Sequence, residues 1–391
     1  MTRELLVAGG GIAGLAAAKA AREAGWEARL FEQAAAFSEI GAGLQLGPNA
    51  TRVLRGWGVL DDPSLRPFTP PRLRVRDAGS GRELGRLSLG AHAESRYGAP
   101  YVTVHRADLH ASLLRAATDS GVRLHVGERI AGVQVDGDAV LARIGSGLQV
   151  EADALAVADG VWSELRQRLL HDGPAPATGH VAYRALLPVA GLPLNLRSDD
   201  VQAWLGPRMH LVRYPVRGGD ALNFVAFIEG HAAGSSWDQA APVGELLSAV
   251  GSLCSELRGL LDAVPQWRSW PVHDREPVRG PQEMAIGRAA LLGDAAHPMR
   301  PYLAQGAGMA IEDAAELQRV LAACDGRVID VPTALRRYAL NRWERCARVQ
   351  QRSRRNGTIF HATGVVRLGR DLAMRAGGEG VLDLPWLYRG A

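Results

Sequence analysis

Hydrophobic and polar positions change their pattern twice along the chain, near residue 176 and again near residue 271. The opening stretch, residues 4–33, reads ELLVAGGGIAGLAAAKAAREAGWEARLFEQ. It contains a short apolar run, a glycine-rich turn, an alanine-rich run closed by Gly25, and a second apolar run that ends at Phe31. Short apolar runs bounded by glycine predict buried strands, and the alanine-rich run predicts a helix. The stretch therefore predicts one strand–helix–strand unit.

Strand and helix patterns continue to alternate as far as about residue 170. Residues 100–117 predict a strand that leads into an amphipathic helix, and residues 121–144 predict short strands with Gly/Asp turns. Residues 150–169 predict a strand, then the pair Asp159-Gly160, then another helix. Strands that alternate with helices are typical of a parallel sheet.

The pattern differs between residues 176 and 271, where prolines, tryptophans and alternating apolar segments predict a mostly antiparallel sheet. The α/β pattern returns with GRAALLGDAAHP at residues 287–298. A helix is then predicted from about Gly308 to Val320, with Ile311, Ala315 and Leu317 facing the core.

Together these patterns predict an α/β protein with a Rossmann-like domain that is discontinuous in sequence, an inserted sheet domain and C-terminal helices. We assign residues 1–72, 99–175 and 272–330 to the Rossmann-like domain. Residues 73–98 and 176–271 form the predicted substrate domain, and residues 331–391 the C-terminal helical segment.

Three glycines in the first turn have the spacing of a dinucleotide-binding motif. Gly9, Gly11 and Gly14 form GxGxxG between the predicted strand and helix. The first suits the tight turn, the second lets the backbone approach a pyrophosphate, and the third lets the helix pack on the strand. Glu32, at the end of the second strand, can accept hydrogen bonds from a ribose diol. We therefore expect a bound dinucleotide.

Composition excludes several other classes of protein. The 391 residues carry 45 Lys+Arg and 41 Asp+Glu, a net charge of +4, with no long run of like charge. Binding to nucleic acid is therefore not expected. No segment reaches the roughly 20 apolar residues of a membrane span. The three cysteines, Cys254, Cys324 and Cys346, lack the spacing of a zinc site or a disulfide framework, so we predict a reducing, cytoplasmic location.

A second acidic residue stands far from the glycine motif, in the apolar loop LLGDAAHPMRPYLAQGAG. No second GxGxxG unit follows, so Asp294 has no function on a short nucleotide. A longer cofactor such as FAD, with its AMP half at Gly9–Gly14, extends far enough for Asp294 to bind the ribityl hydroxyls. Gly306 and Gly308 would then direct backbone N–H groups at the flavin. The alternative is that Asp294 is a helix or turn cap, which leaves the glycines unexplained.

Three segments, AGGGIAG…FEQ, ADGVWSELR and LLGDAAHPMRPYLAQGAGMAIEDA, resemble the single-component flavoprotein aromatic hydroxylases. EIGAGLQLGPNA and HLVRYPVRGG resemble the branch with salicylate and 3-hydroxybenzoate hydroxylases and 6-hydroxynicotinate monooxygenase. The resemblance spans nearly the whole chain. It implies tightly bound FAD, NADH or NADPH as a transient co-substrate, and hydroxylation of a small aromatic acid by O₂ through a flavin C4a-hydroperoxide, without a metal.

The resemblance also implies site residues. Gly9, Gly11, Gly14, Glu32 and Gln33 would hold the AMP half, Arg106 the flavin chain and Asp294 the ribityl group, while Asp159 would serve FAD and visiting NAD(P)H. Pro301 would lie beside the reactive edge of the flavin. The complete predicted cofactor set is Gly9, Gly11, Ile12, Ala13, Gly14, Glu32, Gln33, Gln45, Arg106, Ile130, Asp159, Gly293, Asp294, Pro301, Gly306, Ala307 and Gly308.

For the aromatic substrate, His210 and Tyr214 are the predicted catalytic residues, because their spacing places both on one face of a strand. Their alternative role is ordinary sheet packing. Gln45, where the pyridine-acting relatives have histidine, favours a benzene ring. His297 has no carboxylate at ligand spacing beside it, so we interpret it as structural. Trp204, Trp267 and Trp270 are interpreted as core residues.

Three alternatives remain open at this point. One is a hydroxynicotinate-type pyridine hydroxylase. Another is a flavin oxidase or reductase on the same scaffold, which would need no nicotinamide. The third is an FAD-bound sensor or assembly protein without catalysis. A homodimer is the default assembly.

Overall fold

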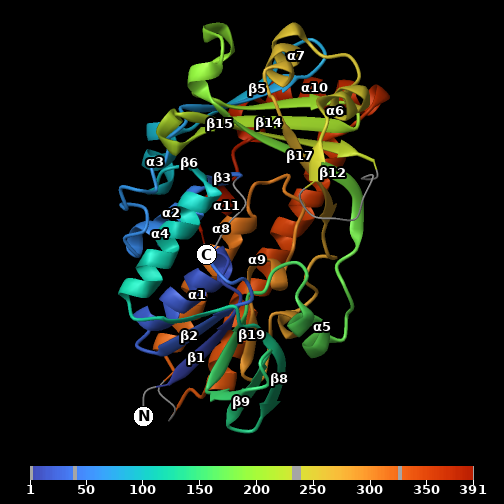
Figure 1. Cartoon of the computed structure of the whole chain (residues 1–391). Coiled ribbons are helices and arrows are strands. Elements are labelled where there is room, and N and C mark those ends of the chain that lie inside the picture. Colours follow the sequence, from blue (N-terminus) through green and yellow to red (C-terminus); the bar gives the residue numbers. More distant parts are fainter. Residues whose placement is uncertain (1–2, 38–41, 231–238, 325–327, 391) are drawn as a thin grey trace.

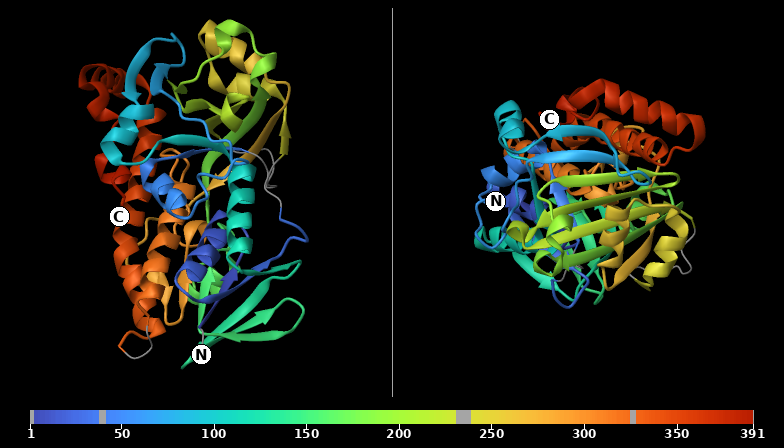
Figure 2. Two further views of the ribbon diagram at one scale, coloured as in Figure 1. Left: turned by 90° about the vertical axis from the view of Figure 1, so that its left-hand side faces the viewer. Right: turned by 90° about the horizontal axis from the view of Figure 1, so that it is seen from above.

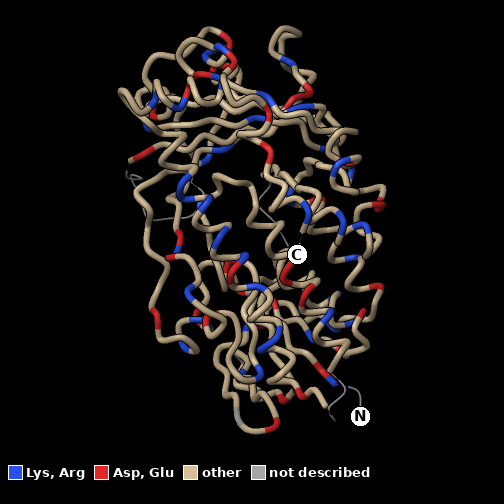
Figure 3. The backbone as a smooth tube through the Cα atoms, turned by 180° about the vertical axis from the view of Figure 1, so that it is seen from behind, with Lys and Arg blue, Asp and Glu red and all other residues tan. Residues whose placement is uncertain are grey.

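The computed structural model describes residues 3–37, 42–230, 239–324 and 328–390 (Figure 1). Two large sheets lie at opposite ends of the molecule, with helices between them. Seen from above, the strands of the upper sheet cross over the lower part of the molecule (Figure 2). Acidic and basic residues are interspersed along both parts of the chain (Figure 3).

The lower sheet is built around the first predicted strand. Its order is β18-β19-β11-β1-β2-β7, and all neighbours are parallel except β18 and β19. The inner strands are almost completely buried because helix α1 and the small sheet of residues 130–152 both pack against them, which explains their continuous apolar runs. The strands are β1 (Glu4–Ala8), β2 (Glu27–Glu32), β7 (Arg123–Val126), β11 (Ala154–Val157), β18 (Ala285–Ile286) and β19 (Ala289–Leu291).

Helices α1 and α8 pack against each other between the lower sheet and the rest of the molecule. Residues Gly306–Ala322 form α8, which begins two residues before its predicted start. Ala315, predicted to face the core, is only half-buried, whereas Glu312 and Asp313 are buried. The helices of this part are α1 (Ile12–Glu23), α2 (Pro48–Gly56), α3 (Gly90–Tyr97), α4 (Arg106–Asp119), α5 (Glu164–Leu170) and α8.

Two small sheets complete the lower part. One has the order β10-β9-β8, and the other pairs β3 with β6. Their strands are β3 (Gly43–Leu46), β6 (Val102–His105), β8 (Ile130–Asp136), β9 (Ala139–Ile144) and β10 (Gln149–Ala152).

The upper sheet has the order β16-β17-β12-β15-β14-β13-β4-β5 and is antiparallel except between β13 and β4. Strands from residues 72–88 thus belong to the same sheet as strands from residues 177–273. The exact boundaries of the two domains stay a prediction. The strands are β4 (Arg72–Asp77), β5 (Glu83–Ser88), β12 (Ala177–Pro188), β13 (Val201–Gly206), β14 (Met209–Val216), β15 (Ala221–Glu229), β16 (Gln239–Ala241) and β17 (Trp267–His273).

The two faces of the upper sheet have different neighbours. Trp204, Leu211 and Trp267 face a core shared with α6 (Val243–Val250) and α7 (Ser255–Asp262). His210 and Tyr214, at alternate positions of β14, lie on the opposite face, toward the lower part of the molecule. The sheet therefore separates a sealed apolar layer from a face that is available for a ligand.

The C-terminal helices connect the two parts. Helix α9 (Val331–Phe360) packs along α8 and ends against the upper sheet, and α10 (Gly364–Gly377) and α11 (Pro385–Tyr388) follow it. Among the described residues, none of the helices has both the length and the apolar character needed to cross a bilayer.

We expect Gly14→Ala to destabilise the protein. An added Cβ would lie 1.8 Å from the carbonyl oxygen of Gly9, so the first turn has to shift. Overpacking of this kind costs about 1–3 kcal/mol or more. Gly369→Ala in α10 is the control, because its Cβ meets no atom of the described residues within 4 Å and Ala in a helix stabilises by about 0.5–1 kcal/mol. Urea midpoints measure both variants, and a Gly14→Ala midpoint equal to that of the wild type would contradict the packing argument.

Candidate active site

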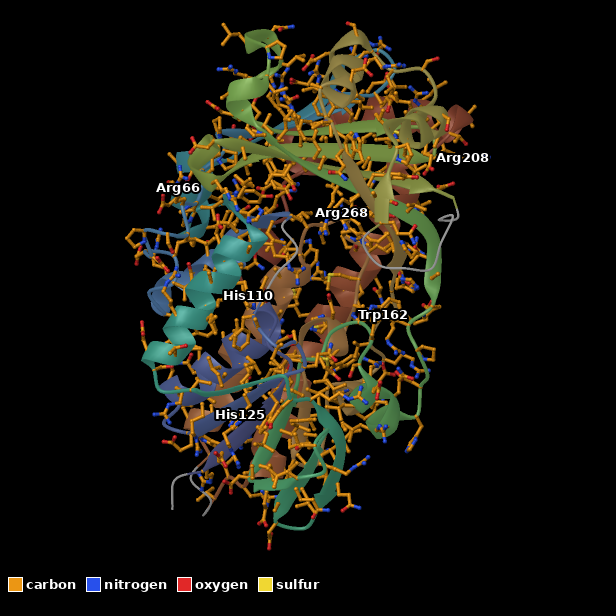
Figure 4. All side chains as sticks on the ribbon, in the orientation of Figure 1. Arg66, His110, His125, Trp162, Arg208 and Arg268 are labelled. Atoms are coloured by element: carbon orange, nitrogen blue, oxygen red, sulfur yellow. The ribbon has the colours of Figure 1, made fainter. Side chains whose placement is uncertain are left out.

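Two adjoining cavities form one elongated channel between the lower sheet and the upper sheet. The first has a volume of about 500 Å³ and the second about 360 Å³, both typical of ligand sites. His110 and Trp162, labelled in Figure 4, line the first cavity and come from α4 and from the loop before α5. The residues that line both cavities are Gly11, Arg106, Ala158, Gly160 and Arg184.

The first cavity begins at the turn between β1 and α1. Gly9 has φ +100°, and Gly11 caps α1 without any side-chain hydrogen bond, so the first N–H groups of the helix face the channel. Such a helix start favours a phosphate through its free donors and its positive dipole end. Glu32 accepts hydrogen bonds from the N–H groups of Gly10 (2.7 Å) and Ala34 (2.8 Å). It therefore anchors the turn while also lining the cavity.

Asp159, directly after β11, has an unusual environment in the first cavity. Its Oδ1 atom is buried and has no hydrogen-bond partner among the residues that the structure describes. Burial raises the pKa of its carboxyl to about 6, although Ser163 opposes the shift through a hydrogen bond. Ile130 and Gln33 line the same cavity. A buried acceptor without a partner is costly unless a ligand supplies a donor.

Asp294 lies in the second cavity, in the short turn after β19. Its side chain is exposed to the cavity. Desolvation by the surrounding protein atoms nevertheless raises the pKa of its carboxyl, whereas the charges of Arg106 and His297 oppose this shift. Pro301, Gly306 and Ala307 line the wall beside it, and α8 begins there without a side-chain cap. The beginnings of α1 and α8 thus both supply free N–H groups to the channel.

This arrangement fits an extended dinucleotide such as FAD. A phosphate-binding helix start, an unpartnered carboxylate oxygen at Asp159 and the exposed Asp294 occur in sequence along one channel. The AMP half fits the first cavity, and the ribityl and ring parts fit the second.

Four of the predicted site residues do not line the channel. Gly14, Gly293 and Gly308 lie behind its wall, where added Cβ atoms would collide with Gly9, Ala13 and Gln305 respectively. These glycines permit close packing rather than contact with the cavity. His210 also lies behind the wall, against Phe227. The other predicted residues line one or both cavities, and the role of each stays a prediction.

The upper sheet forms one wall of the second cavity. This wall has apolar side chains at its centre and polar side chains at its ends. Val212, Val225 and Phe227 line it, together with Tyr214. Tyr214 is buried, which raises the pKa of its hydroxyl, and a hydrogen bond with Gln45 partly opposes that shift. The Gln45 Oε1 atom also accepts from the hydroxyl of Tyr101 at 2.8 Å. Gln45 therefore connects two tyrosines at one end of the cavity.

Sequence reasoning missed several residues of the wall, among them Arg184, Trp270 and Asn223. Arg184 on β12 lies with its guanidinium carbon 4.6 Å from the ring centre of Trp270, which we interpreted as core but which lines the cavity. Asn223 on β15 accepts a hydrogen bond from the N–H of Gly43 at 2.7 Å and also lines the cavity. The signal available in the sequence was the presence of an Arg and an Asn within otherwise apolar strands.

His297 has the carboxylate partner that we did not expect. Its Nε2 lies 2.6 Å from Asp313 Oδ2, and both side chains are buried. Burial opposes charge on His297, but Cys346 and Asp313 raise its pKa well above the ordinary value. These three residues could hold a metal by distance, yet the Arg342 guanidinium already binds Asp313 Oδ1 at 2.8 Å. We therefore assign the group to the packing of α8 on α9.

Comparison with known proteins identifies the family. Residues 2–353 match the family described as FAD binding domain. The chain belongs to this family. FAD is its cofactor, and the protein is an FAD-dependent aromatic monooxygenase, a family in which NAD(P)H is the typical co-substrate. The predicted family and enzyme class are thereby confirmed.

Relatives with assigned activities match along almost the full chain. A 3-hydroxybenzoate 6-hydroxylase of Polaromonas naphthalenivorans is 38% identical over 387 residues, covering 98% of this chain and 95% of the relative. A 6-hydroxynicotinate 3-monooxygenase of Bordetella bronchiseptica is 38% identical over 355 residues, covering 90% and 91%.

Solved structures confirm the predicted fold class. A salicylate hydroxylase substrate complex superposes with a TM-score of 0.83 at 25% identity, covering 100% of this chain and 96% of the other. Klebsiella pneumoniae HpxO complexed with FAD and uric acid gives 0.84 at 26% identity, covering 97% and 94%.

We expect Asp294→Ala to weaken FAD binding. Loss of a hydrogen bond to a charged group costs about 1.5–3 kcal/mol, which corresponds to an affinity roughly 10- to 100-fold lower. Fluorescence titration of the apoprotein with FAD measures the change. Asp294→Asn keeps an acceptor and should retain most of the affinity, while Asp119→Ala, at an exposed position of α4, is the control. Equal affinity in Asp294→Ala and wild type would remove Asp294 from the flavin site.

Proposed function

We propose that this monooxygenase hydroxylates a small aromatic acid that carries a phenolic hydroxyl, a hydroxybenzoate such as 3-hydroxybenzoate or salicylate, with NADH or NADPH and O₂ as co-substrates. The observation that carries the proposal is the sheet-side wall of the second cavity, which is apolar at its centre and polar toward its ends. The hydroxybenzoate-acting relatives, 34–38% identical to this chain, support the same substrate class.

The spacing along β14 suits a single ring. Val212 lies halfway between His210 and Tyr214, and all three lie on one face of the sheet. At about 3.3 Å per residue, the two polar residues are roughly 13 Å apart along the strand. A ring over Val212 would direct one polar substituent toward Tyr214 and another toward His210, behind Phe227.

Each polar residue suits one task in hydroxylation. Burial keeps Tyr214 protonated, so it is a hydrogen-bond donor for an oxygen of the substrate. Burial, together with His361 and His180, lowers the pKa of His210 well below its ordinary value, so its ring is neutral. Because His210 lies behind Phe227, its predicted role as a base requires Phe227 to move aside when the substrate binds. When bound, FAD supplies the activated oxygen. Val225, Phe227 and Trp270 exclude water from the ring.

A pyridine ring is the second candidate, because the 6-hydroxynicotinate 3-monooxygenase matches as closely as the hydroxybenzoate enzyme. Gln45 lines the second cavity, at the position where the pyridine-acting relatives have histidine. Its amide oxygen already accepts a hydrogen bond from the hydroxyl of Tyr101. This favours the benzene ring over the pyridine.

A substrate panel tests the proposal directly. We expect 3-hydroxybenzoate or salicylate to accelerate NADH or NADPH consumption and to yield a hydroxylated product, identified by mass spectrometry. Benzoate, which lacks the phenol, should give no product, and 6-hydroxynicotinate should be the poorer substrate. Product from 6-hydroxynicotinate alone would contradict the assignment to benzene rings.

Tyr214→Phe should reduce hydroxylation while leaving FAD bound, because it removes one donor to the substrate and no contact of the first cavity. We expect a loss of about 10²-fold in kcat/KM, within the range for acid–base and hydrogen-bonding groups. Tyr183→Phe is a matched control, since Tyr183 packs against the opposite face of the sheet. If Tyr214→Phe retains the wild-type kcat/KM and product yield, Tyr214 does not contact the substrate.

The expected homodimer and the cytoplasmic location stay predictions. Among the described residues, Cys254, Cys324 and Cys346 form no disulfide.

A further inference from the structure

Helix α10 (Gly364–Gly377) exposes most of its large apolar side chains. Val365 is 82% exposed, and Val366, Leu368 and Leu372 are 65%, 64% and 65% exposed. Among the described residues, eleven large apolar side chains are exposed, and four of them lie on the 14 residues of this helix. They therefore form a patch, and exposed apolar patches mark interaction surfaces, whereas scattered single residues do not.

The opposite side of α10 is attached to the protein mainly by polar contacts. Arg370 is buried and donates to the carbonyl groups of the last two residues of α9, at 3.3 and 2.7 Å. Arg367 forms an ion pair with Asp77 at the end of β4. Met374 is the one large apolar side chain of α10 that is buried. A surface helix usually has its apolar side inward and its charged side outward. In α10 this arrangement is reversed, so a single chain leaves its apolar side in water.

Four residues form a straight stripe along the exposed side. Val365, Gly369, Leu372 and Ala376 follow one another at spacings of four, three and four residues, which places them on one line of a helix, and all four are exposed. The stripe contains no charged residue, as is typical of the core of a protein–protein interface. Arg375 lies at its edge, where the stem of the side chain can cover apolar surface while the guanidinium stays in water.

The order of side chains in the stripe is complementary to its own reverse. A second copy of α10 in antiparallel orientation would place its Ala376 opposite Val365 and its Leu372 opposite Gly369. Each layer then combines one large and one small side chain, so the two helices can pack closely without voids. A parallel pair would instead oppose large with large and small with small. The antiparallel contact closes on a twofold axis, which is the symmetry of most homodimers.

We propose that α10 pairs in antiparallel orientation with α10 of a second copy of this chain, along the stripe Val365–Gly369–Leu372–Ala376. The helix lies at the outer edge of the molecule, in red in the right-hand view of Figure 2, where another chain can approach it. With 14 residues it is about 21 Å long, and a contact of this length buries less than the roughly 800 Å² per partner of a standard interface. The dimer is therefore reversible, with a dissociation constant in the micromolar range or weaker.

Sedimentation velocity of the FAD-loaded protein tests the dimer and does not depend on the proposed substrate. Between about 1 and 300 µM, the mass of the wild type should rise from that of one chain toward that of two. Leu372→Glu places a charge in the stripe and should raise the dissociation constant at least about tenfold. Leu194→Glu is the matched control, because Leu194 is 79% exposed in the turn between β12 and β13, and this variant should dimerise like the wild type. Flavin absorbance per chain checks that both variants are folded.

Cysteine cross-linking tests the antiparallel register. Val365→Cys in one chain should face Ala376→Cys in the other. Two copies of either cysteine would lie roughly 16 Å apart along the helices, too far for a disulfide, which needs Cα atoms within about 7 Å. Mild oxidation should therefore link an equal mixture of the two variants but neither variant alone. Leu194→Cys is the control for chance collisions.

Three results would overturn the pairing. One is a wild type that keeps the mass of one chain at every concentration; if it then binds to phosphatidylcholine vesicles, a membrane surface covers α10 instead of a second copy. Another is a dimer that Leu372→Glu does not weaken, because its interface lies elsewhere. The third is a cross-link in Val365→Cys alone, which would indicate parallel helices.

Discussion

The parallel pairing of β19, β11 and β1 is the constraint on which the site depends. Because neighbouring parallel strands end at one edge of a sheet, the turn after β1, Asp159 after β11 and Asp294 after β19 meet along that edge. These residues are separated by up to 285 positions in sequence but lie along one channel. A cofactor bound there must be long and extended, and this favours FAD over a single nucleotide.

Burial of charge has different consequences at two places in the protein. In the packing of α8 on α9, every buried charge is paired: Arg342 binds both Glu312 and Asp313, and His297 binds Asp313. In the channel, Asp159 and Asp294 have raised pKa values and a carboxylate oxygen of Asp159 is unpartnered. Paired buried charges serve the structure, whereas unpaired ones indicate where a ligand supplies the missing partner.

The sequence predicts the local parts of this site well. The glycine turn, the helix start of α1 and Glu32 lie within one strand–helix–strand unit, so their relation can be inferred from spacing alone. Asp294 was identified because an apolar, glycine-rich loop with an acid is unusual. The resemblance of several motifs to the aromatic hydroxylases supplied the activity, which the family match and the relatives then confirmed.

Contacts between distant segments were not predictable in this way. Arg184 and Trp270 lie on strands whose alternation does not reveal which face meets the channel. Asp313 stands 16 residues after His297, outside any ligand spacing, and only the start of α8 brings them together. His361 is 151 residues from His210, and the end of the long α9 places it against the sheet.

The most direct test of an extended cofactor is calorimetric titration of the apoprotein with FAD, FMN and AMP. We expect FAD to bind several orders of magnitude more tightly than either half, because one linked molecule occupies both cavities. FMN or AMP binding as tightly as FAD would contradict this expectation, because one cavity would then supply all of the affinity.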